Sequence, residues 1–452
     1  MTNQEKWKRL SAILDEAEAY GRAIGKLNFD MECCAPEEGM EQAGDDMALL
    51  GKHIHALTHS PEYAALVGEL HADGEGLSFP QRKTVEHLWE RYEKEKNLTE
   101  EFDHAWSVAA NRAYGKWLAA KKASDFSLFR DSLAEVVDFT RKAIDLRDEK
   151  PATYYNACLD DTEKGGNEAQ MDAFFGALKE RIVPLMRRIQ AEGKPIREDF
   201  LTRPCPIPEQ ERFSHYLLEA EGLRKSALVL MTTEHPFTTE FGPHDVRVTT
   251  HYFEDNFISN IFSTLHEGGH ALFMQNEPEE FWREHTAGSM SNAMHECISR
   301  FYENIIGRSE AFIHFVYPKL QEISGDTFSD VSERELYEAV NIARPSLIRT
   351  EADELTYSLH ILIRYELEKL MLNGEITVDE IPVLWNAKYK EYLGLDVPDD
   401  ACRMSTGPRA TATSRPTRSA APTAHRFWPP WKRTSMSSPP SGRGSSLPSG
   451  TG

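Results

Sequence analysis

A His-Glu-x-x-His sequence, His266 to His270, lies inside an apolar stretch of this chain between Ile258 and Phe273. Residues four apart lie on the same face of a helix, so both imidazoles can bind one metal ion if the segment is helical. The apolar residues around the two histidines favour a buried helix over a chance match. Glu267 can then accept a proton from a water whose pKa the metal has lowered. The segment therefore predicts a metal-binding helix in a hydrolase.

Two histidines leave such a site incomplete, because catalytic zinc sites use three protein ligands and one water. A third histidine six residues after His270 is excluded, since position 276 is Asn276. The downstream candidates are Glu284, His285, His295 and Glu296. Residues 291–304 have the pattern of a helix that can pack against the first one, and their His-Glu pair is the best source of the ligand. Spacing alone leaves the choice open, because each candidate could equally be a surface residue or support a ligand indirectly.

Composition limits the class of protein. The chain has 452 residues, of which 40% are apolar, and a formal net charge of −22, which disfavours binding to nucleic acid or anionic membranes. Its first residues lack an apolar signal segment, and no apolar run approaches the ~20 residues that span a bilayer. The six cysteines are scattered without Cys-x-x-Cys pairs, as in proteins of reducing compartments. We therefore expect a cytoplasmic, soluble protein with no nucleic-acid and no membrane partner.

Helical periodicity dominates the chain. Residues 4–149 read as successive amphipathic helices, and further helices are expected near 168–191, 208–232, 256–276, 291–306, 309–323, 333–342 and 350–373. Strand character appears mainly at 245–252, where β-branched residues alternate with polar ones. The pattern predicts a mostly α protein with a small β element beside the metal helix.

Five short segments follow one another through the first 401 residues. They are His235-Pro236-Phe237, Asp245-Val246-Arg247-Val248-Thr249, the His266–His270 segment, His295-Glu296-Cys297-Ile298-Ser299-Arg300 and Arg349-Thr350-Glu351-Ala352-Asp353-Glu354. In this order they resemble the carboxypeptidase Taq family (M32) of metallocarboxypeptidases. The resemblance implies a large helical gluzincin (neurolysin-like) body with a deep central groove, a homodimer, and Glu296 as third metal ligand. Cys297 and Ile298 depart from the usual Ser-Gln, and His251 stands where Arg is expected.

The resemblance also implies a carboxypeptidase of broad specificity, with Glu267 as the general base. A free α-carboxylate is best met by arginine, whose planar guanidinium can contact both oxygens. Arg247 and Arg349 are therefore substrate-binding candidates, although most arginines of an acidic protein form only weak surface ion pairs. His235 is a further candidate, with a structural role in a Pro-containing turn as the alternative.

The expected cofactor is Zn²⁺, with Co²⁺ and Mn²⁺ as alternatives for a site of two histidines and one glutamate. The expected partners are peptides with a free C-terminus. Two other functions stay open: a helical gluzincin oligopeptidase that cuts internally, and a catalytically impaired metal-binding protein.

Composition changes abruptly near Ala401. Residues 402–452 carry eight of the 51 Lys and Arg and none of the 73 Asp and Glu. Rich in Ser, Pro and Arg, this segment has too little apolar surface to fold. We therefore expect one helical metallocarboxypeptidase domain over 1–401, incomplete at its C-terminal end, and a basic, disordered or frameshifted tail over 402–452. A shifted reading frame permits Leu-Gln-Asp-Val-His-Trp and Phe-Pro-Thr-Tyr-Ala-Leu-Gly there, similar to family segments that are otherwise missing.

Overall fold

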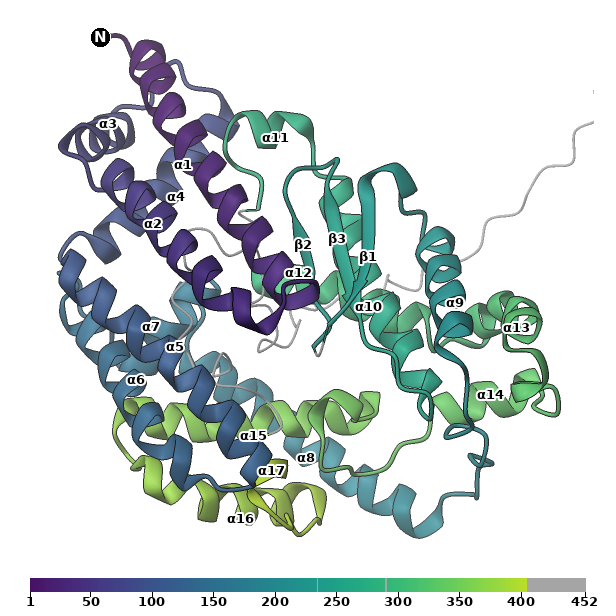
Figure 1. Cartoon of the computed structure of the whole chain (residues 1–452). Coiled ribbons are helices and arrows are strands. Elements are labelled where there is room, and N and C mark those ends of the chain that lie inside the picture. Colours follow the sequence, from purple (N-terminus) through teal and green to yellow (C-terminus); the bar gives the residue numbers. More distant parts are fainter. Residues whose placement is uncertain (234, 289–290, 405–452) are drawn as a thin grey trace, which may run out of the picture.

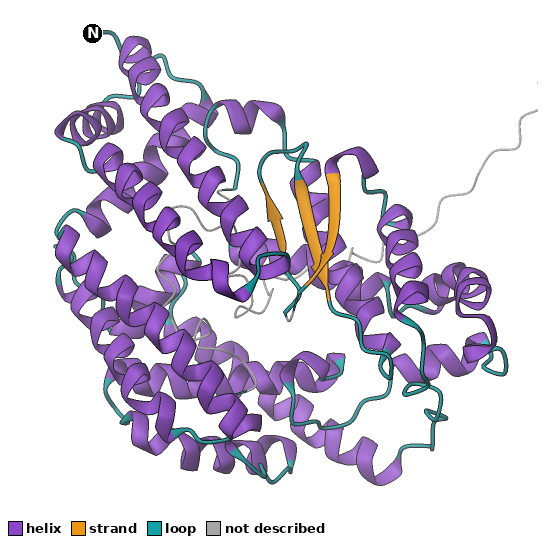
Figure 2. Cartoon of the chain, in the orientation of Figure 1, coloured by secondary structure: helices purple, strands orange, loops and turns teal. Residues whose placement is uncertain are grey.

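Helices build nearly all of the protein. The structure is a computed structural model that describes residues 1–233, 235–288 and 291–404 (Figure 1). Within these ranges the helices surround one small three-stranded sheet (Figure 2). None of the helices in this part of the chain is both long enough and apolar enough to cross a membrane. The prediction of a mostly α protein with a small β element is confirmed.

The first half of the chain is a succession of helices that pack largely as sequential pairs, as predicted for residues 4–149 (Figure 1). They are α1 (Asn3–Cys33), α2 (Met40–Thr58), α3 (Pro61–Ala72), α4 (Phe79–Glu95), α5 (Glu100–Ala123), α6 (Ser127–Asp145), α7 (Tyr154–Thr162) and α8 (Glu168–Glu192). Most begin at a Ser, Thr or Asn whose side chain accepts a hydrogen bond from the first turn, as Thr2 does for α1 and Ser78 for α4. These caps explain why the helices begin where they do.

The second half carries the metal helix. Its helices are α9 (Ile207–Ala220), α10 (Phe257–Gln275), α11 (Glu279–Arg283), α12 (Asn292–Arg300), α13 (Glu310–Ser324), α14 (Glu333–Val340), α15 (Glu354–Asn373), α16 (Ile381–Leu393) and α17 (Asp400–Arg403). The metal helix predicted over 256–276 is α10. The helix expected over 350–373 begins later, because Asp353 caps α15 and residues Arg349–Glu351 form a separate 3₁₀ turn.

The sheet lies against one side of α10. Its order is β1-β3-β2, with β1 (Leu228–Thr232) parallel to β3 (Val246–Thr250) and β2 (Thr238–Glu240) antiparallel to β3. Val246 and Val248 are fully buried and pack in one apolar cluster with Ala271 and Met274 of α10. Side chains of a strand alternate between its faces, so this pair fixes which face of β3 meets the metal helix.

The predicted helix over 208–232 is wrong in its last part. Helix α9 ends at Ala220, and Gly222 follows with a φ of 92°, a left-handed conformation that favours glycine. Residues Leu228–Thr232 then form β1, which pairs along its whole length with β3. A partner strand distant in sequence decided the conformation of this short apolar run, which periodicity alone did not distinguish from helix.

Two apolar clusters form most of the core. One lies around α15 and is built with α5 to α8 and α16, while the other joins α9 and α10 to α13 and α14. Leu265 and Phe262 of the metal helix belong to the second cluster. The metal helix is therefore held between an apolar helical layer and the sheet.

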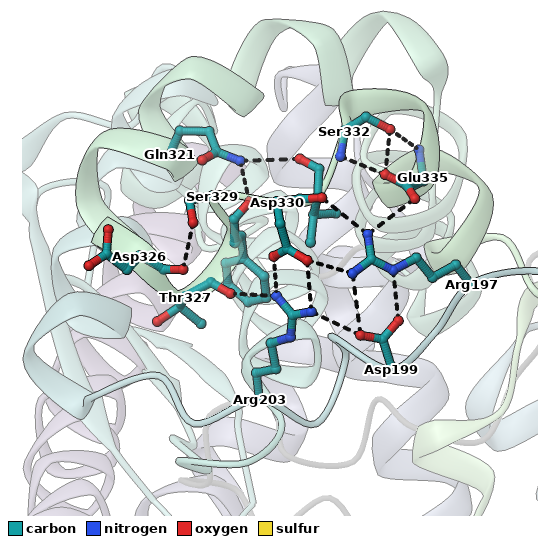
Figure 3. A network of polar contacts seen from close by, with 12 residues as sticks. Arg197, Asp199, Arg203, Gln321, Asp326, Thr327, Ser329, Asp330, Ser332 and Glu335 are labelled. Atoms are coloured by element: carbon teal, nitrogen blue, oxygen red, sulfur yellow. Dashed lines mark hydrogen bonds and ion pairs between the residues drawn. The ribbon is translucent and has the colours of Figure 1, made fainter.

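A network of exposed ion pairs ties the link between α8 and α9 to the loop between α13 and α14 (Figure 3). Asp330 lies between Arg197 and Arg203, and Asp199 contacts both arginines. Isolated surface pairs contribute little, but shared partners lower the entropic cost of fixing each side chain. The network adds polar contacts to two loops that the second apolar cluster already joins through Phe200 and Phe328.

Glu368 on α15 makes the stability of the fold depend on pH. Burial raises the pKa of its carboxyl to about 8, although Arg364 and the hydroxyl of Tyr155, 3.4 Å away, act in the opposite direction. The folded protein holds this proton more tightly than the unfolded chain does. The contribution of the protonated carboxyl to the free energy of unfolding is therefore complete below about pH 4.5 and is lost as the pH rises to about 8. We expect Glu368→Gln to lose less stability than the wild type between pH 5 and 8, by on the order of 3 kcal/mol.

Urea unfolding at both pH values measures this difference. The exposed Glu375→Gln on the same segment is the matched control and should follow the wild type. Equal pH slopes for Glu368→Gln and the wild type would contradict the assignment.

The start of the predicted tail belongs to the helical body. Cys402 and Arg403 lie in α17, and Met404 is buried, with its main-chain oxygen accepting a hydrogen bond of 3.0 Å from Trp117 Nε1. The rest of the predicted 402–452 tail, from residue 405 onward, lies outside the described residues.

Candidate active site

Three predicted metal ligands meet at one point. His266 and His270 come from α10 and Glu296 from α12, and one ligand atom of each lies within 4.8 Å of the other two. His266 Nε2 is 3.6 Å from Glu296 Oε2. Among the residues that the structure describes, no other group of His, Cys, Asp and Glu is arranged closely enough to share an ion. The histidine pair predicted on α10 and the glutamate predicted on α12 therefore lie together in the structure.

The chemistry of this group fits a divalent metal ion. Two imidazole nitrogens and one carboxylate oxygen are the donor set of catalytic zinc sites, which leave one position for water. His270 and Glu296 are only 5% and 4% exposed, so a buried carboxylate here requires a positive partner. The site can hold an ion and still present a water to a substrate.

Gly269 permits the two metal-bearing helices to approach closely. A Cβ atom at this position would lie 2.9 Å from the Cα of Ser299 and 3.2 Å from the main-chain oxygen of Ile298. Both of these residues belong to α12, immediately after Glu296. The glycine inside the His-Glu-x-x-His segment therefore sets the distance between the histidine pair and the carboxylate.

Glu303 holds the outer nitrogen of His266. Its Oε2 atom is 2.8 Å from His266 Nδ1 and accepts a hydrogen bond of 2.9 Å from Arg300 Nη1. Burial raises the pKa of Glu303, but Arg300 and the hydrogen bond from His266 outweigh it and bring that pKa to about 2. An ionised Glu303 accepts a hydrogen bond from Nδ1–H of His266, which keeps the proton on Nδ1 and leaves the lone pair of Nε2 facing the ligand group.

The sequence analysis missed Glu303, although a signal was present. It follows Glu296 by seven residues, so the two lie on the same face after two helical turns. The turn Phe301–Ile306 is a π-helix, a wider turn than an α-helix, and it carries Glu303 to the far side of His266. Carboxylates from one continuous helical segment thus flank both nitrogens of one imidazole.

Glu267 lies beside the ligand group and is held by the sheet. The hydroxyl of Thr238 on β2 lies 2.9 Å from Glu267 Oε2 and 2.9 Å from the main-chain oxygen of the same residue. Glu267 is 3% exposed. Strand β2, which no periodicity indicated, therefore positions the predicted general base.

Two of the other candidates for third ligand, Glu284 and His285, contact residues away from the ligand group, whereas His295 lies beside it, with its ring centroid 5.6 Å from that of His270. Glu284 accepts a hydrogen bond of 2.9 Å from Gln81, and His285 lies between Ser11 at 2.9 Å and Glu18 at 2.7 Å. His295 is buried with its ring against Phe273, and this burial lowers its pKa to about 4. His285 and Glu284 anchor the segment after α11 to the N-terminal helices.

The structure does not bring Arg247 to the ligand group. Its neighbours Val246 and Val248 face α10, so the Arg247 side chain lies on the opposite face of β3. There it forms two hydrogen bonds with Asp245, at 2.8 and 3.1 Å, and stacks on the rings of Phe29 and Phe241. Arg247 joins the sheet to α1 in this structure.

Arg349 is connected to the ligand group through other side chains. It is 3% exposed, and its Nη1 donates a hydrogen bond of 2.9 Å to the hydroxyl of Tyr357. The Tyr357 ring lies against Arg300, which contacts Glu303. His235 is exposed, and its main-chain oxygen accepts a hydrogen bond from Thr233. Arg349 is thus linked through Tyr357, Arg300 and Glu303 to the predicted ligand His266.

A mostly helical body with this ligand group defines a helical metallopeptidase. Residues 9–403 match the model of the family described as Carboxypeptidase Taq (M32) metallopeptidase. The chain therefore belongs to this family and is a metallocarboxypeptidase, and membership implies a divalent metal ion.

Two curated relatives and one solved structure illustrate the similarity. The chain is 36% identical to Carboxypeptidase 1 of Bacillus subtilis, over 87% of this chain and 78% of that protein. It is 34% identical to Thermostable carboxypeptidase 1 of Thermus thermophilus, over 87% of this chain and 79% of that protein. The M32 carboxypeptidase from Deinococcus radiodurans superposes with a TM-score of 0.83 at 30% identity, covering 94% of this chain and 83% of that one.

Proposed function

We propose that this chain removes residues from the free C-terminus of peptides with broad specificity, using Zn²⁺ held by His266, His270 and Glu296. The observation that carries the proposal is the buried convergence of these three side chains, with Glu267 next to them in sequence and space. We further propose that the enzyme is cytoplasmic, as its scattered cysteines favour, and a homodimer, as the resemblance implies.

The residues around the ion have separate tasks. A divalent ion bound by His266, His270 and Glu296 would supply Lewis acidity for the scissile carbonyl and for a water. The Glu267 carboxylate, positioned by Thr238, accepts the proton of the attacking water and delivers it to the leaving amine. Glu303 keeps His266 in the required tautomer and orientation.

Arg349 is our proposed ligand for the substrate's α-carboxylate. Arg247 is already paired with Asp245 and packed between two aromatic rings, so binding a substrate would break those contacts. Arg349 comes from the turn before α15, and its guanidinium is held through Tyr357 in a buried environment. An ion pair formed in such a place loses less to solvent screening than one at the surface.

A pair of substrates tests the recognition of the carboxylate. We expect the zinc-loaded protein to shorten a free-acid peptide stepwise and to leave the matching C-terminal amide intact, as read by mass spectrometry. We expect Arg349→Met to lower kcat/KM for the free acid by about 100-fold, because one partner of a desolvated charge pair is removed.

Arg247→Met is the matched control and should leave the preference for the free acid unchanged. Internal cleavage of both peptides would favour an oligopeptidase. Zinc binding without any cleavage would favour an impaired enzyme.

The frameshift near Ala401 also stays a proposal. It is supported by the loss of every acidic residue after Asp400 and by the match of the family model up to residue 403. Resequencing of the gene decides it, because codons that do not permit the shifted reading would refute it.

A further inference from the structure

Tyr357 contacts Arg349, the proposed ligand of the substrate's carboxylate, and also Arg300, which pairs with Glu303 beside the predicted metal ligands. Its hydroxyl accepts the hydrogen bond of Arg349 Nη1 at 2.9 Å. The guanidinium carbon of Arg300 lies 3.9 Å from the centroid of the Tyr357 ring, which is a stacking distance for a cation on an aromatic face. The guanidinium carbon of Arg349 is 5.7 Å from the same centroid, so one side chain at the start of α15 contacts both arginines, Arg300 more closely through its ring and Arg349 through its hydroxyl.

The contacts continue without a gap from Tyr357 to the ligand group. Arg300 Nη1 donates to Glu303 Oε2 at 2.9 Å, and the same oxygen is 2.8 Å from His266 Nδ1. Arg300 is the last residue of α12, whereas Tyr357 is on α15 and Arg349 precedes it. Two segments distant in sequence, the end of α12 and the start of α15 with the turn before it, therefore meet at this tyrosine.

We propose that Tyr357 is a positioning residue that couples the metal group to the substrate-binding arginine: its hydroxyl orients Arg349 and its ring fixes Arg300 and, through Glu303, His266. This inference rests on the proposed role of Arg349 for its first half only. The second half concerns metal affinity and holds whether or not Arg349 binds the substrate.

The geometry also explains how two cations are placed near each other. Like charges repel, and a buried guanidinium needs a partner. Arg300 has the Glu303 carboxylate and the negative face of the Tyr357 ring, while Arg349 has the hydroxyl oxygen of the same residue. A leucine would offer neither contact, and a phenylalanine would offer only the ring.

Two variants separate the two contacts. Tyr357→Phe removes the hydroxyl and keeps the ring, and we expect it to weaken binding of a free-acid dipeptide about tenfold without changing zinc affinity. Tyr357→Leu removes both, and we expect zinc affinity to fall about tenfold as well, the size of effect seen when support of a ligand histidine is lost. Zinc affinity is measured by competition with a chelating indicator, and dipeptide binding by calorimetry against the matching amide, so neither readout requires turnover.

Tyr365→Phe is the matched control. It lies on the same helix, and its hydroxyl donates to Asp172 at 2.6 Å, away from this chain of contacts. It should change neither zinc affinity nor dipeptide binding. A double-mutant cycle with Arg300→Gln, which removes the cation from the Tyr357 ring, adds a second test, because Tyr357→Leu should cost no further zinc affinity in that background.

The outcomes distinguish this inference from the proposed function. Wild-type zinc affinity in Tyr357→Leu, or additive losses in the cycle with Arg300→Gln, would overturn the link to the metal group. Unchanged dipeptide binding in Tyr357→Phe would overturn the link to Arg349, provided that Arg349→Met does weaken it. If Arg349→Met also has no effect, the proposed carboxylate ligand fails, and the zinc measurements still decide the rest.

Discussion

Glu267→Gln should retain the metal and lose turnover by about a thousandfold, the range expected for removal of a general base. Glutamine has nearly the same shape as glutamate, and its carbonyl oxygen can still accept the hydrogen bond that Thr238 donates to Glu267. It cannot accept a proton at neutral pH. The three predicted metal ligands are untouched, so metal content should stay close to that of the wild type.

Metal analysis and single-turnover kinetics on the same sample measure the two effects. Glu240→Gln is a suitable control, because it removes another largely buried carboxyl from β2, two residues after Thr238, that does not belong to the ligand group. Its turnover should equal that of the wild type. Near-normal turnover in Glu267→Gln would exclude this residue as the base, and loss of metal would show that its main role is structural.

Gly269→Ala is expected to damage the site without altering any polar group. The new methyl would lie 2.9 Å from the Cα of Ser299, a main-chain atom that can move only if α12 moves. Such overpacking typically costs about 1–3 kcal/mol of folding stability. Because Glu296 precedes Ser299 by one helical turn, we also expect zinc affinity to fall by about 10- to 100-fold.

Gly176→Ala on α8 is the control for this substitution. No atom lies within 4 Å of the position a Cβ would take there, so alanine should stabilise the helix by about 0.5–1 kcal/mol. Denaturant unfolding and zinc competition measure both variants. A stable Gly269→Ala with normal zinc affinity would show that the two helices tolerate a greater separation than the structure indicates.

The amino-acid sequence by itself predicted the features that depend on residues close to one another along the chain. The four-residue spacing of His266 and His270 and the apolar surface around them predicted α10, because helix geometry brings such residues to one face. Alternation of β-branched and polar residues predicted β3. Apolar periodicity predicted most of the other helices, whereas the short apolar run of β1 was taken for helix.

Tertiary structure decided the contacts between segments distant in sequence. Of the four candidates for third ligand, it placed Glu296 beside the two histidines, because Gly269 lets α12 approach α10 closely at this point. It also brought Thr238 to Glu267 and Glu303 to His266, and it placed Arg247 on the far face of the sheet. Local sequence fixes the face on which a side chain lies, but only the packing of the whole chain determines what that face meets.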